Sequence, residues 1–463
     1  MTSADFVALL PLLILAASPL FVMLAIMVRR GPASPAISFA SLAAAFASLW
    51  IAAGVAPRPV TPILIIDRYA LFYIGIIVAV TAGCVLLSWG YFRNHAEHPD
   101  ELYVLLLIAA LGSAVLASSS HFASFFLGLE ILSVSLYGLI AYERDIEPSI
   151  EAGVKYLVLA ASSASFLLFG MALVYFELGT MSFAQIANAS GPLVTIGFVL
   201  ILVGVGFKLA LVPFHMWTPD IYQGAPAPVA AFVATVSKTA VFAVLLRYYM
   251  SAAAGRAPFV ILSAIAIASM LAGNLLALRQ DNVKRILAYS SIAHLGYILV
   301  ALLAGGSMGD RAVTFYLIAY SFTTLGAFAV VAVVSRIERE ADHVENYRGL
   351  FWRHPIVSGI LTIMMLSLSG LPVTAGFIAK FYLVAAGADQ NLWLLITILI
   401  VGSAIGLFYY LRVVVAMYSP APTQETPLAP HFAERIVLAA LALIVIWLGI
   451  YPAPVLNAIA QVF

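Results

Sequence analysis

The chain has 463 residues, of which 64% are hydrophobic and only 9% are charged, with a formal net charge of +1. Soluble globular proteins carry about 25% charged residues, so this composition excludes a soluble protein and indicates one that crosses a membrane many times. The near-zero net charge gives no sign of a nucleic-acid partner, and the single cysteine, Cys84, excludes an intramolecular disulfide and any cysteine-built metal or iron–sulfur site.

A membrane-spanning helix needs about 20 mostly apolar residues. The chain offers fourteen such segments, at 5–28, 34–55, 68–92, 101–118, 121–142, 150–177, 193–223, 227–250, 257–278, 283–304, 310–336, 355–386, 391–418 and 432–452. The first lacks a basic leader, so we interpret it as a retained helix. Long unbroken apolar runs exclude a barrel, so we expect an all-α polytopic membrane protein. The join "ASSSHF" leaves open that the fourth and fifth segments form one kinked helix.

Loop charges predict the orientation, because cytoplasmic loops collect lysine and arginine. The loops after odd-numbered helices hold Arg29, Arg30, Arg93, Arg144, Arg279, Lys284, Arg285, Arg336, Arg339, Arg348 and Arg353. The loops after even-numbered helices hold only Arg58, Arg256 and Arg311, with Arg68 at a helix start. We therefore expect the odd loops to be cytoplasmic and both termini to lie on the periplasmic side of a bacterial inner membrane.

Lysine is distributed differently from arginine. Of the five lysines only Lys284 is assigned to a loop, the polar stretch "RQDNVKR" that leads into the span 283–304, whereas Lys155, Lys208, Lys238 and Lys380 fall inside expected spans. Most arginines lie in loops or near helix ends. Arginine stays charged almost everywhere, but a buried lysine can lose its proton. A lysine within the bilayer is therefore a candidate proton carrier.

The alternative for each lysine is that its long side chain reaches the headgroup region. Lys155 lies a few residues into its helix, so this alternative stays open there. Lys208 and Lys380 lie well inside apolar sequence. Lys238 is separated from either end of its helix by about 16 Å of hydrocarbon, which a lysine side chain cannot cross.

A glutamate and a histidine also lie in the bodies of expected spans. Glu130 lies in the body of the fifth helix, where it would either pair with Lys208 or Lys155, or be protonated and bond a backbone carbonyl. His294 adds an imidazole suited to passing protons, although a lone membrane histidine is also often only a hydrogen-bonding core residue. Both are candidates for a proton path.

Proline and glycine interrupt two of the expected helices. The seventh contains Pro213 shortly after Lys208, and the twelfth contains Gly370 and Pro372 shortly before Lys380. A proline inside a helix removes one hydrogen bond and exposes a carbonyl. Interrupted helices in matching positions of two halves are the best sequence pointer to a transport site.

The interrupted helices are the fourth members of two consecutive blocks of five, helices 4–8 and 9–13. Because five is odd, the second block must be inverted relative to the first. The expected organisation is three N-terminal helices in 1–99, a first five-helix repeat in 100–254, an inverted second repeat in 255–420, and a C-terminal helix in 421–463.

Three phrases resemble the antiporter-like membrane subunits of respiratory complex I. They are "GFKLALVPFHMWTPDIYQGAPAPVAAFVATVSKTAVFA", "QDNVKRILAYSSIAHLGY" and "LSGLPVTAGFIAKFYL". The resemblance covers most of the chain from the fourth helix onward. Two of the phrases are most similar to the branch of that family that has lysine, rather than glutamate, at the position of Lys380.

The resemblance implies a proton-translocating subunit in the membrane arm of NADH:quinone oxidoreductase, beside other antiporter-like and small membrane subunits. It implies that NADH, FMN, iron–sulfur clusters and quinone are bound by partner subunits and that this chain carries no redox site. The residues that match the family's proton path are Glu130, Lys155, Lys208, Lys238, His294 and Lys380. One departure is that the thirteenth helix offers only Arg412 as a counterpart to Lys238.

Three other functions remain open at this point. The same lysine-bearing helices occur in subunits of Mrp-type cation/proton antiporters and of membrane hydrogenases. A third alternative is a structural brace without a proton path of its own, which predicts that replacing Lys238 leaves turnover intact.

Overall fold

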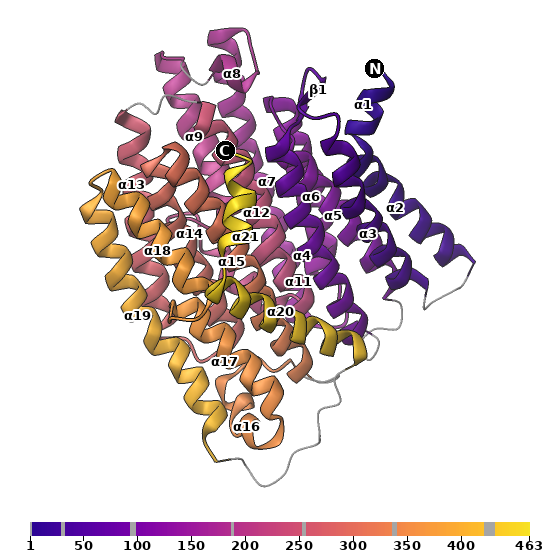
Figure 1. Ribbon diagram of the computed structural model, residues 1–463, viewed down its shortest axis with the longest axis vertical. Helices are drawn as coiled ribbons and strands as arrows, with labels where there is room; N and C mark the ends of the chain where they lie inside the picture. Colours follow the sequence, from indigo (N-terminus) through magenta and orange to yellow (C-terminus); the bar gives the residue numbers. More distant parts are fainter. Residues whose placement is uncertain are drawn as a thin grey trace.

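A computed structural model describes residues 2–28, 33–92, 99–186, 189–251, 256–335, 340–420 and 431–463. This part of the chain is almost entirely helical (Figure 1). One antiparallel ribbon of two short strands, β1 (Arg58–Thr61) and β2 (Leu64–Ile66), precedes α4 (Arg68–Phe92). The prediction of an all-α membrane protein is confirmed, since thirteen described helices are long and apolar enough to span a membrane.

The one expected span that is missing from these thirteen is the twelfth, 355–386, which consists of two shorter helices. The N-terminal helices are α1 (Ser3–Ala8), α2 (Leu10–Met27), α3 (Ala33–Ala53) and α4 (Arg68–Phe92). The first block contains α5 (Asp100–Ala117), α6 (Phe122–Ile140), α7 (Glu147–Leu178), α8 (Phe183–Ile186), α9 (Pro192–Leu209), α10 (Trp217–Gly224), α11 (Ala227–Phe232), the π-helical turn η1 (Val233–Ser237) and α12 (Lys238–Ser251).

The remaining helices follow in the second block and the C-terminal segment. They are α13 (Arg256–Ala277), α14 (Val283–Ala304), α15 (Gly306–Val334), the 3₁₀ turn η2 (Val344–Tyr347), α16 (Leu350–Arg353), α17 (Pro355–Ser369), α18 (Ala375–Asp389), α19 (Trp393–Tyr418), α20 (Phe432–Ile450) and α21 (Ala453–Ala460). The most enclosed spans are 227–251, α14 and α15, which lie at the centre of the bundle. Lys238 and His294 belong to these central spans.

Helices α5 and α6 are two separate spans that pack side by side. At their contact, a Cβ atom on Gly112 would approach the Leu132 amide nitrogen to 2.6 Å and the Gly128 carbonyl oxygen to 2.8 Å. Only glycine allows the two backbones to come this close. The alternative of one kinked helix across "ASSSHF" is therefore wrong.

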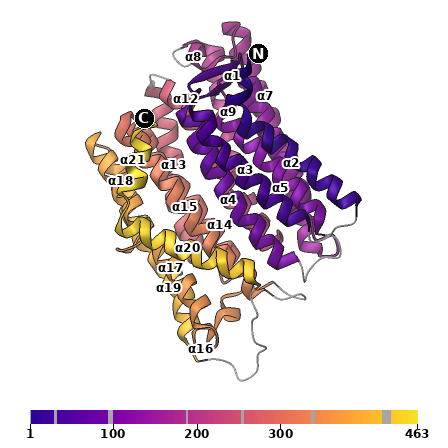
Figure 2. The same cartoon turned by 45° about the vertical axis from the view of Figure 1, so that its right-hand side comes forward.

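Both termini lie toward the same end of the bundle, near α8, and α16 lies at the opposite end (Figures 1 and 2). Helix α20 runs obliquely to its neighbours in both views and contacts α4, α15, α17 and α18. Five arginines used to predict the orientation lie outside the described residues: Arg29, Arg30, Arg93, Arg336 and Arg339.

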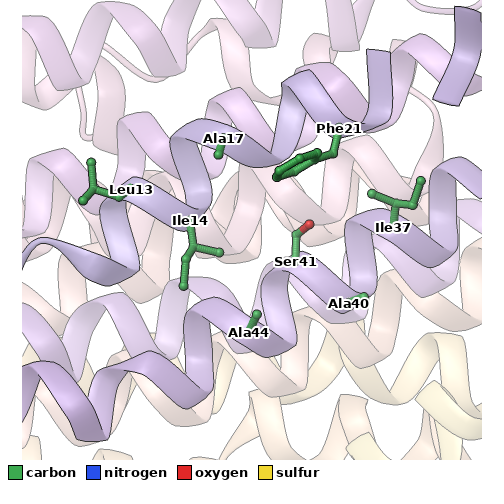
Figure 3. Close-up of a pocket in the computed structure, with 8 residues that line it drawn as sticks. All are labelled: Leu13, Ile14, Ala17, Phe21, Ile37, Ala40, Ser41 and Ala44. Atoms are coloured by element: carbon green, nitrogen blue, oxygen red, sulfur yellow. The ribbon is translucent and has the colours of Figure 1, made fainter. Parts of the chain in front are cut away.

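A shallow apolar groove of about 480 Å³ lies between α2 and α3 (Figure 3). The residues that line it are Leu13, Ile14, Ala17, Phe21, Ile37, Ala40, Ser41 and Ala44. Apart from one serine hydroxyl, these side chains offer no polar group. None of the candidate proton-path residues belongs to this groove.

A bidentate ion pair joins α12 to Asp67, the residue between β2 and α4. The Arg247 guanidinium donates to both carboxylate oxygens of Asp67, at 2.8 and 2.9 Å. Burial raises the pKa of Asp67, but the hydrogen bonds and the charge of Arg247 outweigh it and hold that pKa below its usual value. The pair therefore stabilises the folded protein above pH about 4, and this contribution is lost as the pH falls through the lowered pKa.

We expect Asp67→Asn to lower the free energy of unfolding by about 1–3 kcal/mol at neutral pH, because it removes a charge-assisted pair. The thermal unfolding midpoint of the purified protein, measured at pH 7 and then at decreasing pH, checks this. The difference between parent and variant should shrink as Asp67 becomes protonated in the parent. A difference that is independent of pH would contradict this role of the ion pair.

Candidate functional site

Helix α9 ends inside the bundle, where the sequence predicted an interruption. Ala210 follows its last residue, Leu209, in the left-handed region with a φ of 57°. The Ala210 amide donates to the Phe207 carbonyl at 2.9 Å. The Leu211 amide donates to the Gly206 carbonyl at 2.8 Å. This pattern is a Schellman motif, which satisfies two of the last four carbonyls of a helix.

Helix α17 ends in the same way in the second block. Gly370 follows Ser369 with a φ of 84°. The Gly370 amide donates to the Ser367 carbonyl at 3.0 Å, and the Leu371 amide donates to the Leu366 carbonyl at 3.0 Å. The prediction of interruptions in the seventh and twelfth spans is confirmed, and both interruptions have the same hydrogen-bond pattern.

The carbonyls that the two motifs leave free accept hydrogen bonds from buried lysines. Lys238 Nζ donates to the Lys208 carbonyl at 3.3 Å. Lys380 Nζ donates to the carbonyls of Leu368 and Ser369, both at 2.9 Å. The C-terminal end of a helix carries a negative partial charge that attracts an ammonium group. The broken helices therefore supply acceptors that hydrocarbon lacks.

Lys238 is fully buried and directly follows the π-helical turn η1. Such turns often occur at functional sites, where they change the direction of a side chain. The Lys238 Nζ lies 4.9 Å from the centroid of the Trp217 ring on α10. An aromatic face stabilises a nearby cation, so α9 and α10 contact this lysine from the two sides of their break.

Lys208 lies in the last turn of α9 with 2% of its surface exposed. Its Nζ donates to Ser133 Oγ at 2.7 Å and to the Tyr156 hydroxyl at 3.3 Å. Glu130 lies one turn before Ser133 on α6 and interacts electrostatically with Lys208. In the described part of the chain Glu130 Oε1 has no hydrogen-bond partner, and the ammonium group of Lys208 is bonded to Ser133 and Tyr156 instead.

Lys155 occupies a different environment from the other candidates. Its side chain is 43% exposed and pairs with Glu151 at 2.6 Å and with Asp220 at 3.0 Å. It therefore lies at the surface of the chain and does not pair with Glu130. This position agrees with the alternative that Lys155 reaches the edge of its span.

His294 is bonded on both ring nitrogens. Nδ1 lies 2.9 Å from the Tyr316 hydroxyl and Nε2 lies 3.2 Å from the Tyr410 hydroxyl. The Tyr410 hydroxyl also bonds Ser290. An imidazole with a hydroxyl partner on each ring nitrogen has the geometry that a proton relay requires.

Three hydroxyl groups from α10, α14 and α15 meet near the centre of the bundle. The Tyr222 hydroxyl of α10 lies 3.4 Å from Ser291 Oγ, and the Tyr320 hydroxyl lies 2.8 Å from the same oxygen. The ring centroids of Tyr320 and His294 are 5.5 Å apart. These contacts were not predicted from the sequence, although the phrase "AYSSIAHLGY" contains Ser291 and His294.

Ser403, rather than Arg412, is the α19 residue at the second break. Ser403 Oγ accepts from Lys380 at 2.7 Å and donates to the Ser369 carbonyl at 3.2 Å. Arg412 instead bonds carbonyls at the end of α13 and pairs with Asp281 at 3.4 Å. A serine gives no signal in an apolar sequence, so this position could not be predicted.

Lys284 is buried, which corrects its assignment to a loop. It lies in the first turn of α14 without exposed side-chain surface, and it pairs with Glu340 at 2.5 Å. The short loop before it gave no sign of this burial. Across the described residues, no three histidine, cysteine, aspartate or glutamate side chains gather as metal ligands would.

Comparisons with known proteins identify the family. Residues 119–406 match the family model described as "NADH:quinone oxidoreductase/Mrp antiporter, TM". A relative from Ectopseudomonas mendocina (strain ymp), named NADH-quinone oxidoreductase subunit N, is 49% identical over 476 residues, which cover 99% of this chain and 96% of that protein.

Solved structures with the same fold come from three kinds of membrane complex. A chain of respiratory complex I from Thermus thermophilus is 35% identical with a TM-score of 0.85 and covers 98% of this chain and 100% of its own. A chain of an archaeal membrane-bound sulfane sulfur reductase is 27% identical with a TM-score of 0.87, over 99% of this chain and 96% of its own. A chain of the Mrp complex from Dietzia, 20% identical with a TM-score of 0.86 over 100% and 97% of the two chains, shares the fold.

Proposed function

Because the chain belongs to the subunit N branch of the antiporter-like NADH-quinone oxidoreductase subunits, we propose that it moves protons across the membrane along its buried lysines. The observation that carries the proposal is the pair of breaks: Lys238 and Lys380 are each bonded to a free carbonyl at the end of a broken helix. A purely structural core of this fold would not need an ammonium group at either break.

The proposed path begins at Lys208 and continues to Lys238, whose Nζ contacts the Lys208 carbonyl. From there the proposed path passes the hydroxyl groups around Ser291, reaches His294 and ends at Lys380. Glu130 acts on Lys208 through its charge. Lys155 acts through Asp220, its partner on α10.

The free energy of a pKa change in a buried lysine is large enough to move a proton across the membrane. Moving one charge against 100 mV costs about 2.3 kcal/mol. A change of about two pKa units in a proton carrier corresponds to about 2.7 kcal/mol. A modest change in the electrostatic environment of one buried lysine is therefore enough to drive one transfer.

The redox chemistry belongs to other subunits in this proposal. NADH, FMN, iron–sulfur clusters and quinone are bound by partners, and the chain lies among the other antiporter-like and small subunits of a membrane arm. The proposed orientation places both termini on the periplasmic side of the bacterial inner membrane. The two five-helix repeats, 100–254 and 255–420, form the two half-paths.

The test compares two lysine-to-methionine variants in the intact membrane complex. Lys208→Met should lower the rate of NADH-driven proton pumping by at least about tenfold, because it removes a buried proton carrier. Lys155→Met, which removes an exposed and ion-paired lysine of α7, should lower it less. Pumping is measured in sealed vesicles and normalised to the amount of assembled complex. Normal pumping by assembled Lys208→Met would reject the path and leave a structural brace.

A further inference from the structure

A second group of charges, of which Lys284 is fully buried, lies outside the proposed proton path, where the second block contacts α10. Lys284 Nζ donates to the Ala225 carbonyl at 2.8 Å and to Glu340 Oε2 at 2.5 Å. Ala225 is the C-cap residue of α10. Glu340 Oε1 accepts from the Ala227 amide at 3.3 Å and from the Tyr91 hydroxyl. The ion pair therefore spans the turn between α10 and α11.

Each charge of this pair lies at the helix end that attracts it. The ammonium group of Lys284 contacts the C-terminal end of α10, which carries a negative partial charge. The carboxylate of Glu340 contacts the first amide of α11, where the partial charge is positive. A second carboxylate, Asp342, lies 3.7 Å from Lys284. The site therefore favours one orientation of the pair over its reverse.

Arg285, the residue after Lys284, also bonds to side chains of α10. Arg285 Nη1 donates to Asp220 Oδ1 at 2.7 Å and to Gln223 Oε1 at 3.1 Å. Helix α10 has only eight residues, and its first, Trp217, contacts the ammonium group of Lys238. Two consecutive side chains of the second block thus fix the position of a short helix that contacts a lysine of the first.

We propose that Lys284 and Glu340 are positioning residues, forming an oriented clamp by which the second block holds α10 and keeps Trp217 against Lys238. The clamp acts on proton transfer and therefore rests on the proposed function. It connects the two half-paths mechanically at the turn between α10 and α11, in addition to the hydroxyl groups that meet at Ser291. Neither residue touches the transferred proton.

The clamp is tested in the intact complex by four changes at the pair. Lys284→Met should lower the pumping rate per assembled complex by about two- to thirtyfold, the usual range for residues that couple two sites. Lys284→Arg should recover most of the rate, since it keeps the charge and the donors. The reversed pair Lys284→Glu/Glu340→Lys should not recover it, because both charges then meet repelling helix ends. The neutral pair Lys284→Met/Glu340→Gln should also stay slow.

The matched control is Arg348→Met, which removes an exposed ion pair with Glu345 at 3.6 Å and should pump like the parent. If Lys284→Met does not assemble, the neutral pair carries the same test, since it leaves no unpaired charge between these two residues. Parental pumping by the neutral pair, or recovery by the reversed pair, would overturn the oriented clamp. Failure of the proton path itself is recognised separately, by normal pumping in Lys208→Met.

Discussion

Replacement of Lys238 by methionine is expected to abolish proton pumping almost completely, by about 100-fold, while the complex still assembles. Methionine has a similar length and fills the same buried space without a proton to exchange. The loss of one donor leaves the Lys208 carbonyl unbonded, but it also removes a buried charge, so stability should change little. Pumping is measured in sealed vesicles, and assembly is measured by the amount of intact complex.

Lys238→Arg separates proton transfer from structural support. Arginine keeps the positive charge and the hydrogen-bond donors, but it does not release its proton. A carrier role predicts that this variant also fails to pump. Normal pumping by an assembled Lys238→Arg complex would show that the position needs only a fixed charge.

Replacement of Gly376 by alanine is expected to separate the two halves of the second broken helix. A Cβ atom at this position would overlap the carbonyl oxygen of Ser367, whose hydroxyl also accepts from the Gly376 amide at 3.1 Å. Crowding of this kind costs about 1–3 kcal/mol or more. Because α18 carries Lys380, its displacement should weaken the bonds to Leu368 and Ser369 and lower the pumping rate.

Gly359→Ala is the matched control on α17, because a Cβ atom there meets no atom within 4 Å. It should retain the parental pumping rate and gain slightly in stability from the better helix propensity of alanine. The thermal unfolding midpoint and the pumping rate of both glycine variants are compared with those of the parent. Equal behaviour of Gly376→Ala and Gly359→Ala would contradict the close contact between α17 and α18.

The spans and their interruptions could be predicted because they depend on local sequence. Runs of about 20 apolar residues must form helices in lipid. Pro213 and the group around Gly370 mark places where the helical hydrogen bonds end. The burial of Lys208, Lys238 and Lys380 followed from the same runs, and the structure buries all three.

The hydrogen-bond partners could not be predicted, because they come from residues that are distant in the chain. Nothing in the sequence showed that Lys238 would contact the carbonyl of Lys208, thirty residues earlier. Ser403 was missed for the same reason. Lys284 was assigned to a loop because it follows polar residues, yet helix packing encloses it completely.

The local sequence also suggested contacts that the packing does not form. Glu130 and Lys208 were the simplest pair of opposite charges, but the lysine bonds Ser133 instead. Arg412 was the only counterpart of Lys238 that the thirteenth helix offered, but it bonds the end of α13 and pairs with Asp281. In both cases the partner depends on where the residue lies along its helix. Counting residues in the sequence does not give that position accurately enough to predict the partner.

Infrared difference spectroscopy during turnover tests most directly whether the lysines at the broken helices exchange protons. The complex carries ¹⁵N-labelled lysine, and spectra of the parent are compared with those of Lys238→Met. If these lysines carry protons, ammonium bands of the parent decrease and return during NADH oxidation, and part of this signal is missing in the variant. Ammonium bands that stay constant in the parent throughout turnover would contradict this role.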